Sequence, residues 1–272
     1  MSAGALSGAI GLGPGQILAA AGGGGKTSLL RALGEECHAA GMRPAILTPT
    51  THFFSPEPAG EAPLFLGEVE AVDARLREYG GEWPGPLTLA RRRTGESPVP
   101  GTPGERRMKM GGYRADEIER LRRPGGVVLV EADGARGLPI KAPGPDEPVI
   151  PPGADIVLGV VGLDALGGPI DEAHAFRPEI LSSLTGLPLG APVDAAAIGC
   201  LAAHPEGLFR GAPKSARRVL ICNKSDRIGR MEKPEQIGYI IAEIACAPNG
   251  PADLLLFTAC LPSGLRVGRP VP

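Results

Sequence analysis

The chain of 272 residues lacks the features that mark several protein classes. Its five cysteines are scattered and form no C-x-x-C pair, so we expect buried free thiols instead of disulfides or a zinc knuckle. The formal net charge is only −2, which gives no overall attraction to nucleic acid or a membrane surface. No apolar run approaches the roughly 18 residues that a membrane-spanning helix needs.

Two further absences concern localisation and metals. No basic region precedes the mildly apolar start of the chain, so no signal peptide is indicated and we expect a cytoplasmic protein. The four histidines lie far apart without the spacing of metal ligands, so we expect no metal other than Mg²⁺. Glycine (41) and proline (30) are abundant instead, and because they fall between apolar runs they indicate long loops.

Apolar runs alternate with helical patterns along the chain. The expected strands are Ile17–Ala21, Ala45–Thr48, Val127–Val130, Asp155–Gly168, Val219–Cys222 and Leu254–Phe257. The expected helices are Thr27–Ala40, Glu68–Tyr79, Arg114–Arg123, Arg177–Thr185, Asp194–Ala203 and Pro234–Ala245. This alternation predicts a three-layer α/β fold, with a mostly parallel central sheet flanked by helices. Loops at the carboxyl ends of such strands build the ligand site.

The loop after the first strand has the composition of a phosphate-binding loop. Its residues are Gly22, Gly23, Gly24, Gly25, Lys26, Thr27 and Ser28. Consecutive glycine N–H groups can turn towards an anion, Lys26 can reach the outer phosphates, and the Thr27 hydroxyl can bind Mg²⁺. The usual spacing places a glycine six residues before the lysine, where this chain has Ala20. We therefore predict a P-loop shortened at its start, with Gly22 making the turn; the alternative is a plain strand-to-helix turn.

The loop after the buried strand Val127–Val130 carries two acids. Glu131 and Asp133 are followed by Gly134, whose N–H could approach an outer phosphate. An acid at this place lies beside Mg²⁺ or the attacking water in phosphoryl-transfer sites. We expect Glu131 to bind the metal with Thr27, and Glu131 or Asp133 to serve in catalysis; a solvated acidic turn is the alternative.

The loop after the fifth strand reads N-K-x-D, as in the guanine-recognition motif of GTPases. A carboxylate at Asp226 can accept hydrogen bonds from N1–H and the exocyclic amine of guanine, whereas adenine has no donors there. Asn223 can bond the base edge, and the aliphatic part of Lys224 can cover the ring. We therefore expect GTP in preference to ATP, the alternative being a polar turn. The loop Phe257–Cys260, after the sixth strand, is expected near the base.

Other polar residues give weaker signals. The segment Thr48–His52 follows the second strand and is either a switch loop that reaches Mg²⁺ or a capped polar loop. Arg91–Arg93 is expected to be a solvated run. Lys141 could face the nucleotide or a client protein, and His174 and Arg177 are expected to cap a helix.

The chain resembles the YqeC family of selenium-dependent hydroxylase accessory proteins, from about Gly22 to Asp226. The resemblance rests on "GGGGKTSLL", "TPTTHFF", "KMGGYRADEIERL", "EADGARGLPIKAPGPDEPVIP", "VVGLDALGGPI", "HAFRPEILSSLTG" and "ICNKSD", the fourth being the most specific. Family loops also place the first glycine four residues before the lysine, as Gly22 does here. The switch loop departs from the family in having Pro49 where a further threonine is usual. More distantly, the three loops resemble metallochaperone GTPases that serve urease, hydrogenase and cobalamin enzymes.

The resemblance implies an accessory nucleotidase that helps to mature a selenium-containing molybdenum hydroxylase, which would be its partner together with the maturation machinery. From the residues we expect a slow, Mg²⁺-dependent P-loop GTPase whose oligomeric state the sequence leaves open. We expect a single domain over residues 16–262, with a Pro/Gly-rich insertion near 55–112, a flexible lead-in at 1–15 and a tail at 263–272. Two alternatives stay open: a small-molecule kinase with an acceptor pocket in Gly80–Gly112, and a non-hydrolysing regulator that switches with nucleotide.

Overall fold

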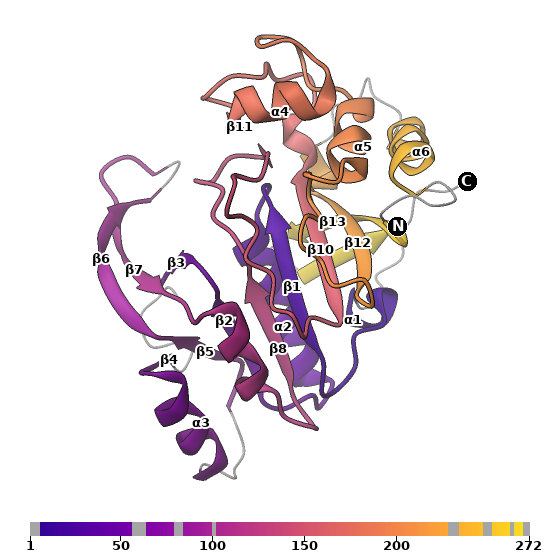
Figure 1. Cartoon of the computed structure of the whole chain (residues 1–272). Helices are drawn as coiled ribbons and strands as arrows, with labels where there is room; N and C mark the ends of the chain where they lie inside the picture. The colour runs from indigo at the N-terminus through magenta and orange to yellow at the C-terminus, as the bar shows by residue number, and fades with distance from the viewer. Residues whose placement is uncertain are drawn as a thin grey trace.

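The computed structural model describes residues 6–55, 64–78, 84–99, 102–227, 234–246, 252–261 and 264–268. A nine-stranded sheet forms its centre, in the order β14-β13-β12-β10-β1-β8-β2-β5-β4 (Figure 1). Eight of these strands pair in parallel, and β14 pairs antiparallel with β13. Their bounds are β1 Ile17–Gly22, β2 Ala45–Pro49, β4 Leu64–Leu66, β5 Leu87–Ala90, β8 Val127–Glu131, β10 Ile156–Gly162, β12 Arg217–Asn223, β13 Leu254–Leu261 and β14 Gly264–Gly268.

The central strands are apolar because both of their faces are buried. In β1, Ile17 and Ala19 contribute to one hydrophobic cluster, and Leu18 and Ala20 contribute to another on the opposite face. The same alternation runs through β8 and β12. This period-two pattern follows from strand geometry and divides the core into two layers.

Helices cover both faces of the sheet. One cluster is completed by α1 (Leu6–Ile10) and α2 (Lys26–Ala39). The other is completed by α3 Val69–Glu78, α4 Pro178–Thr185, α5 Ala195–Ala203, α6 Pro234–Ala245 and the 3₁₀ helices η1 Ala115–Leu121 and η2 Leu163–Ala165. The predicted three-layer α/β fold is therefore confirmed. Each of the six expected strands falls on an observed strand, and Arg114–Arg123 is a 3₁₀ helix where an α-helix was expected.

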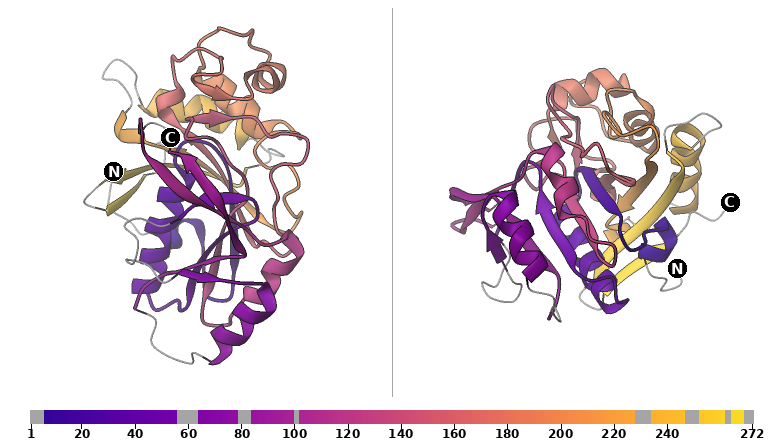
Figure 2. Two further views of the ribbon diagram at one scale, coloured as in Figure 1. Left: turned by 90° about the vertical axis from the view of Figure 1, so that its left-hand side faces the viewer. Right: turned by 60° about the horizontal axis from the view of Figure 1, so that its bottom comes forward.

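The prediction that Gly80–Gly112 is a loop was wrong for its described residues. This region contains β5, β6 (Arg92–Pro98) and β7 (Arg106–Gly111). β7 pairs with β6 on one side and with β3 (His52–Phe54) on the other, in a separate antiparallel sheet that stands beside the main one (Figure 2). Six of the seven residues of β6 are exposed, so the strand lacks the apolar run that reveals a buried strand.

Two end segments also differ from expectation. The predicted flexible lead-in contains α1, in which Leu6 and Ile10 have no exposed surface. The Glu36 carboxylate on α2 accepts the N–H groups of Leu6 (2.9 Å) and Ser7 (2.6 Å), which fixes this short helix. The predicted tail contains β14, and β13 continues through the predicted loop Phe257–Cys260. Contacts with α2 hold α1 in place, and pairing with β13 holds β14. Neither contact is visible in the local sequence.

Within the described ranges, no helix combines the length and apolar character required to cross a membrane. Cys37, Cys200, Cys222 and Cys246 are free thiols; Cys37 and Cys222 are buried as expected, whereas Cys200 and Cys246 are half-buried. The side chain of Cys260 lies outside the described part. The strand order places the carboxyl ends of β12, β10, β1 and β8 next to one another. The three predicted loops therefore meet at one edge of the sheet.

Candidate functional site

The phosphate-loop candidate joins β1 to α2 and requires glycine at its turns. Gly22 has φ +102°, and a Cβ there would lie 2.3 Å from the Val160 carbonyl oxygen. Gly25, the N-cap of α2, also has φ +102°, and its Cβ would lie 3.0 Å from Asn223 Nδ2. Both backbone conformations are in the left-handed region that favours glycine. The turn from the strand thus begins at Gly22, as the shortened spacing predicts.

The backbone N–H groups of this loop differ from the expectation. Gly22 N–H donates to the Asp133 carboxylate (3.1 Å), Gly23 N–H to Val160 O (2.8 Å), and Gly24 N–H to Leu138 O (3.0 Å). These three groups therefore hold the loop in shape instead of pointing to an anion. The N–H groups of the first turn of α2, from Lys26 to Ser28, have no acceptor inside the helix. They lie at the positive end of the helix dipole, where an anion would be favoured.

Lys26 is buried at the start of α2, with 3% of its surface exposed. Its Nζ donates to Gly22 O (2.5 Å) and lies 3.0 Å from Asp133 Oδ1. The ammonium group is thus positioned beside the loop by one carbonyl and one carboxylate. A phosphate at the N-terminus of α2 would compete with Asp133 for the same cation.

Asp133 begins a chain of alternating charges. Its Oδ2 lies 2.8 Å from Lys141 Nζ, and that nitrogen lies 2.6 Å from Glu147 Oε2 and donates to Gly134 O (2.6 Å). Arg177 Nη1 lies 2.6 Å from the same Glu147 oxygen. Burial opposes ionisation of Glu147, but the hydrogen bonds from Arg177 and Lys141 outweigh it and hold the pKa of this carboxyl below its usual value. The chain fixes the segment after β8 against the phosphate loop.

The segment that follows β8 is also held by two short strands. Lys141 belongs to β9 (Ile140–Lys141), which pairs with β11 (Ala175–Phe176). Arg177 caps α4 with φ +64°, and its guanidinium lies 4.5 Å from the centre of the Phe176 ring. The predicted capping position of Arg177 is therefore observed, while its side chain makes an ion pair. Lys141 has no exposed surface.

The hydroxyl of Thr27 and the carboxylate of Glu131 lie next to each other. Thr27 Oγ1 donates to Glu131 Oε2 at 2.9 Å. Burial raises the pKa of Glu131, against the effects of Lys26 and the Thr27 hydrogen bond. A hydroxyl and a carboxylate suit Mg²⁺, which prefers oxygen ligands and takes most of the others from water and phosphate. In the described part of the chain, no three or more His, Cys, Asp or Glu side chains form a metal cluster.

The end of β12 is tied to the phosphate loop through Asn223. Its Nδ2 donates to Gly24 O (2.8 Å), and its Oδ1 accepts from Thr258 Oγ1 on β13 (2.9 Å). Lys224, with φ +60°, places its Nζ 2.6 Å from Asp164 Oδ2. Asp226 lies in η3 (Ser225–Arg227) and is exposed at the rim. Asn223 thus supports the loop, while Asp226 is directed to solvent.

The segment Thr48–His52 gives a mixed result. Pro49 is the last residue of β2, opposite Glu131, and the Thr50 hydroxyl donates to Val149 O (2.7 Å). Thr48 is buried and His52 is exposed. These contacts fit both a switch loop and a capped polar loop.

Of the other weak signals, two of the three arginines, Arg92 and Arg93, are solvated as expected. Arg91 instead pairs with Glu68 at 2.5 Å. His174 lies 2.7 Å from Asp171, just before α4.

Sequence reasoning missed Glu147 and Asp164, and it did not foresee the contacts by which Lys141 and Thr258 hold the site. Lys141 and Glu147 lie in the "EADGARGLPIKAPGPDEPVIP" segment, whose unusual length of polar and proline-rich sequence after a buried strand was the available signal. Asp164 and Thr258 carried no pattern of their own. Their contacts depend on which strands become neighbours, which local sequence does not encode.

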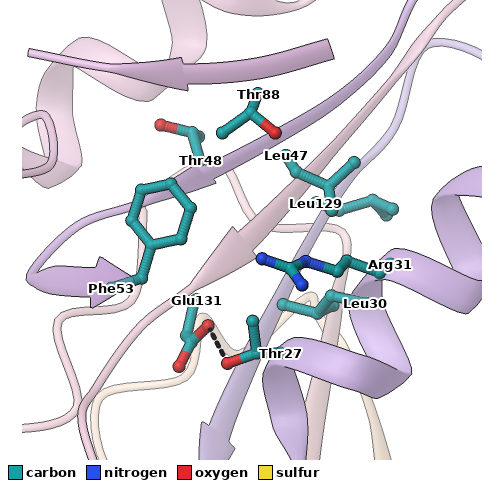
Figure 3. Close-up of a pocket in the computed structure, with 9 residues that line it drawn as sticks. All are labelled: Thr27, Leu30, Arg31, Leu47, Thr48, Phe53, Thr88, Leu129 and Glu131. Atoms are coloured by element: carbon teal, nitrogen blue, oxygen red, sulfur yellow. Dashed lines mark hydrogen bonds between the residues drawn. The ribbon is translucent and has the colours of Figure 1, made fainter. Parts of the chain in front are cut away.

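A cavity opens beside Thr27 and Glu131, on the α2 face of the sheet (Figure 3). Its remaining lining residues are Leu30, Arg31, Leu47, Thr48, Phe53, Thr88 and Leu129. Strands β8, β2 and β5 all contribute to its lining. Nothing in the sequence predicted the contribution of Phe53 to this site.

Comparison with known proteins gives a consistent picture. A sequence model of the family described as YqeC protein matches residues 18–179. The chain is also similar to "Uncharacterized protein YqeC" of Escherichia coli (strain K12), with 31% identity over 210 residues, which cover 76% of this chain and 75% of that protein. No solved structure matches the chain. By this match over more than half of its length, the chain belongs to the YqeC family.

Proposed function

We propose that this protein binds a nucleoside triphosphate with Mg²⁺ at the edge of the sheet formed by β12, β10, β1 and β8. The observation that carries the proposal is the strand–loop–helix unit Gly22–Ser28. Its glycines are required by the backbone, and Lys26 and Thr27 each contact a carboxylate at the end of β8. A helix N-terminus with a lysine and a hydroxyl at this place suits a chain of phosphates.

In this proposal each side chain has a distinct task. Lys26 neutralises charge on the outer phosphates, and Thr27 and Glu131 hold Mg²⁺, which would bridge and polarise those phosphates. Asp133 positions Lys26 through their 3.0 Å contact, so its part in catalysis is indirect. Glu131, the acid nearest the Thr27 hydroxyl, orients the metal or the attacking water. Positioning and charge stabilisation would give slow hydrolysis in the isolated protein.

Guanine is the favoured base. Asn223 connects the end of β12 to the phosphate loop, which places Lys224 and Asp226 at the rim of the same site. The exposed Asp226 carboxylate can accept two hydrogen bonds from guanine, whereas adenine would leave it without a donor.

The partner in this proposal is a molybdenum hydroxylase that carries selenium, or its maturation machinery. Support for this part comes from the resemblance to the accessory proteins of the YqeC family. A cytoplasmic nucleotide-driven accessory protein would act by binding its client differently in the two nucleotide states. GTP binding without phosphate release, with the client present, would instead assign a non-hydrolysing regulator.

A small-molecule kinase is the second candidate, and the cavity beside Thr27 and Glu131 favours it. The enclosed space of about 20 Å³ has room for a water molecule only, so in a kinase the acceptor would lie at its open mouth, next to the transferred phosphoryl group. A phosphate-transfer assay with radiolabelled GTP separates the two functions, because hydrolysis gives only inorganic phosphate. The cavity is lined by Thr88, which falls in the region where the kinase alternative expects an acceptor pocket.

Replacing Lys26 tests nucleotide binding. We expect Lys26→Ala to weaken binding of Mg·GTP about 100-fold in isothermal titration calorimetry, because a charge that faces the phosphates is lost. Lys214→Ala, at an exposed lysine, is the matched control and should bind like the parent chain. Circular dichroism checks that both variants are folded. Undiminished binding to folded Lys26→Ala contradicts the proposed site.

Replacing Asp226 tests the base. Asp226→Asn turns one acceptor oxygen into a donor, so we expect GTP affinity to fall about 10-fold or more while ATP affinity stays the same. Asp146→Asn, at another exposed aspartate, controls for the loss of one negative charge. Competition titrations with both nucleotides measure the ratio. Equal affinity of the parent chain for GTP and ATP would refute the assignment of Asp226.

A further inference from the structure

Among the described residues other than glycine, three have a left-handed backbone conformation, and all three are basic. They are Arg136 (φ +51°), Arg177 (φ +64°) and Lys224 (φ +60°). A positive φ is unfavourable for a residue with a Cβ, and arginine and lysine lack the short polar side chain that lets asparagine or aspartate adopt it. Such a conformation persists where the surrounding structure fixes it, often at a functional site. Each of these cations therefore needs an explanation.

Two of the three cations are held by an acid. Arg177 Nη1 lies 2.6 Å from Glu147 Oε2, and Lys224 Nζ lies 2.6 Å from Asp164 Oδ2. Arg136 differs from them, because within the described ranges of the chain its guanidinium makes no ion pair and no hydrogen bond. Ion pairs thus account for two of the strained residues and leave Arg136 unexplained.

Arg136 rests on an aromatic ring that already holds another cation. Its guanidinium lies 4.8 Å from the centre of the Phe176 ring, and the guanidinium of Arg177 lies 4.5 Å from the same centre. Arg136 is exposed, and a cation–π contact at an exposed site contributes no more than a left-handed backbone costs. The guanidinium is therefore held loosely, and its N–H donors are available to an anion.

The turn that carries Arg136 is bonded directly to the phosphate-loop candidate. It lies between β8 and β9, and Leu138, two residues further along, accepts the Gly24 N–H at 3.0 Å. Since consecutive Cα atoms are about 3.8 Å apart, the Cα of Arg136 lies within about 7.6 Å of that of Leu138. The turn follows Glu131, which is bonded to Thr27, whereas β12 with its N-K-x-D residues lies on the other side of β1. Arg136 is thus on the side proposed for the outer phosphates, away from the base.

We infer that Arg136 binds the terminal phosphate of a nucleoside triphosphate and so lets the site distinguish a triphosphate from a diphosphate. On binding, the guanidinium leaves Phe176 and donates to phosphate oxygens, a charge-assisted contact that is stronger than the ring contact it replaces. Lys26 lies in the loop itself and serves both nucleotides, whereas Arg136 reaches the phosphate that a diphosphate lacks. The inference rests on the proposed function, to which it adds the residue that reads the nucleotide state.

The test uses the full chain and two Mg²⁺ complexes, one of GDP and one of a GTP analogue with an imido link between its last two phosphates. The imido link prevents hydrolysis, so isothermal titration calorimetry measures binding alone. We expect Arg136→Ala to weaken the analogue about 30-fold and GDP less than about 3-fold, because GDP offers no terminal phosphate to the guanidinium. Arg93→Ala, at an exposed arginine of β6, is the matched control and should change neither affinity.

Arg136→Gly separates this role from a structural one. Glycine adopts a positive φ without strain, so this variant should unfold at the same urea concentration as the parent chain or at a higher one. It should nevertheless lose the preference for the triphosphate, as Arg136→Ala does. If Arg136 instead serves to hold the turn on Phe176, Arg136→Gly should unfold at lower urea and weaken both nucleotides equally, and the inference is overturned.

Lys26→Ala separates this inference from the proposed function. If the parent chain binds both nucleotides and Lys26→Ala loses both, while Arg136→Ala behaves like Arg93→Ala, then Arg136 does not read the terminal phosphate and the nucleotide site stands. If the parent chain binds neither nucleotide, the proposed function is refuted and the inference with it. Circular dichroism checks that each variant is folded.

Discussion

At the residue scale, the buried charge of Lys141 matters more for the structure than one expects of a lysine in a polar, proline-rich segment. It has no exposed surface and lies within 2.8 Å of Asp133 and 2.6 Å of Glu147. A lysine is rarely buried completely unless it is paired, and this one is paired with two carboxylates. Since Asp133 also holds Lys26, the placement of the phosphate-loop lysine depends on a residue 115 positions away in the chain.

Removing this cation should destabilise the whole fold. Lys141→Met keeps the length of the side chain but leaves two carboxylates facing an uncharged group, so we expect the free energy of unfolding to fall by about 3–5 kcal/mol. Urea denaturation at pH 7 measures the change. The exposed Lys214→Met should alter stability by no more than about 0.5 kcal/mol. A loss equally small for Lys141→Met would show that this ion-pair chain does not stabilise the fold.

The residue types of the loop Gly22–Ser28 were enough to predict it from the sequence. Glycine, lysine and threonine were recognisable because backbone turns and phosphate chemistry restrict each position to one or two residue types. Lys141 and Glu147 were not, because a lysine or a glutamate in a loop is usually exposed. Only the pairing of β9 with β11, and the approach of Arg177, turn these two residues into buried partners.

At the scale of elements, the turn between β1 and α2 shows why four successive glycines occur. Gly22 N–H bonds to Asp133, while a Cβ at Gly22 would meet the backbone of β10 at 2.3 Å. The turn is therefore packed tightly between two neighbouring strands. Ala20, where the usual spacing has glycine, is inside β1 and needs no unusual conformation.

A pair of glycine variants separates conformation from packing. Gly41 also has a positive φ (+83°), but no atom lies within 4 Å of the Cβ that alanine would add. Gly41→Ala should therefore cost only the backbone strain, about 1–2 kcal/mol. Gly22→Ala should cost about 1–3 kcal/mol more because of the clash with Val160. Chemical denaturation compares them, and equal losses would show that packing at Gly22 is not tight.

Secondary structure was predictable for the longer buried strands, whereas β5, which is buried but only four residues long, was missed. The strands β1, β8, β10 and β12 are apolar runs, and the helices that cover them have the matching period. The strands β6 and β14 were missed because they lie at edges, where the sequence is under little constraint from a core. The short α1 was missed since its stability comes from burying Leu6 and Ile10 and from Glu36, and not from its own sequence.

At the scale of the whole molecule, each of the two core layers contains one buried thiol, whose reactivity can be used to measure unfolding of that layer. Cys37 on α2 belongs to one hydrophobic cluster and Cys222 on β12 to the other, and neither has exposed surface. Burial, with a smaller effect of Glu36, raises the pKa of Cys37 to about 12, and burial likewise raises the pKa of Cys222. Both thiols should therefore be protonated and unreactive in the folded protein at pH 8.

If the two layers unfold together, both thiols should become reactive at the same urea concentration. Iodoacetamide labelling at pH 8, read by peptide mass spectrometry across a urea series, measures each site separately. Cys200 and Cys246 are partly exposed and serve as internal controls that react at lower urea. Two distinct midpoints for Cys37 and Cys222 would contradict a single cooperative domain.

The bonded glycines of the proposed phosphate loop also bear on how quickly the proposed nucleotide would bind. Because Gly22, Gly23 and Gly24 already donate to protein acceptors, the loop does not have to be ordered when the ligand arrives. Most of the entropic cost of shaping it is incurred when the chain folds. Association should then be governed by the encounter itself and by the release of Lys26 from Asp133, with little rearrangement of the backbone. In the proposed site the loop is thus shaped in advance by the fold, and the Lys26–Asp133 ion pair is the contact that a phosphate would exchange.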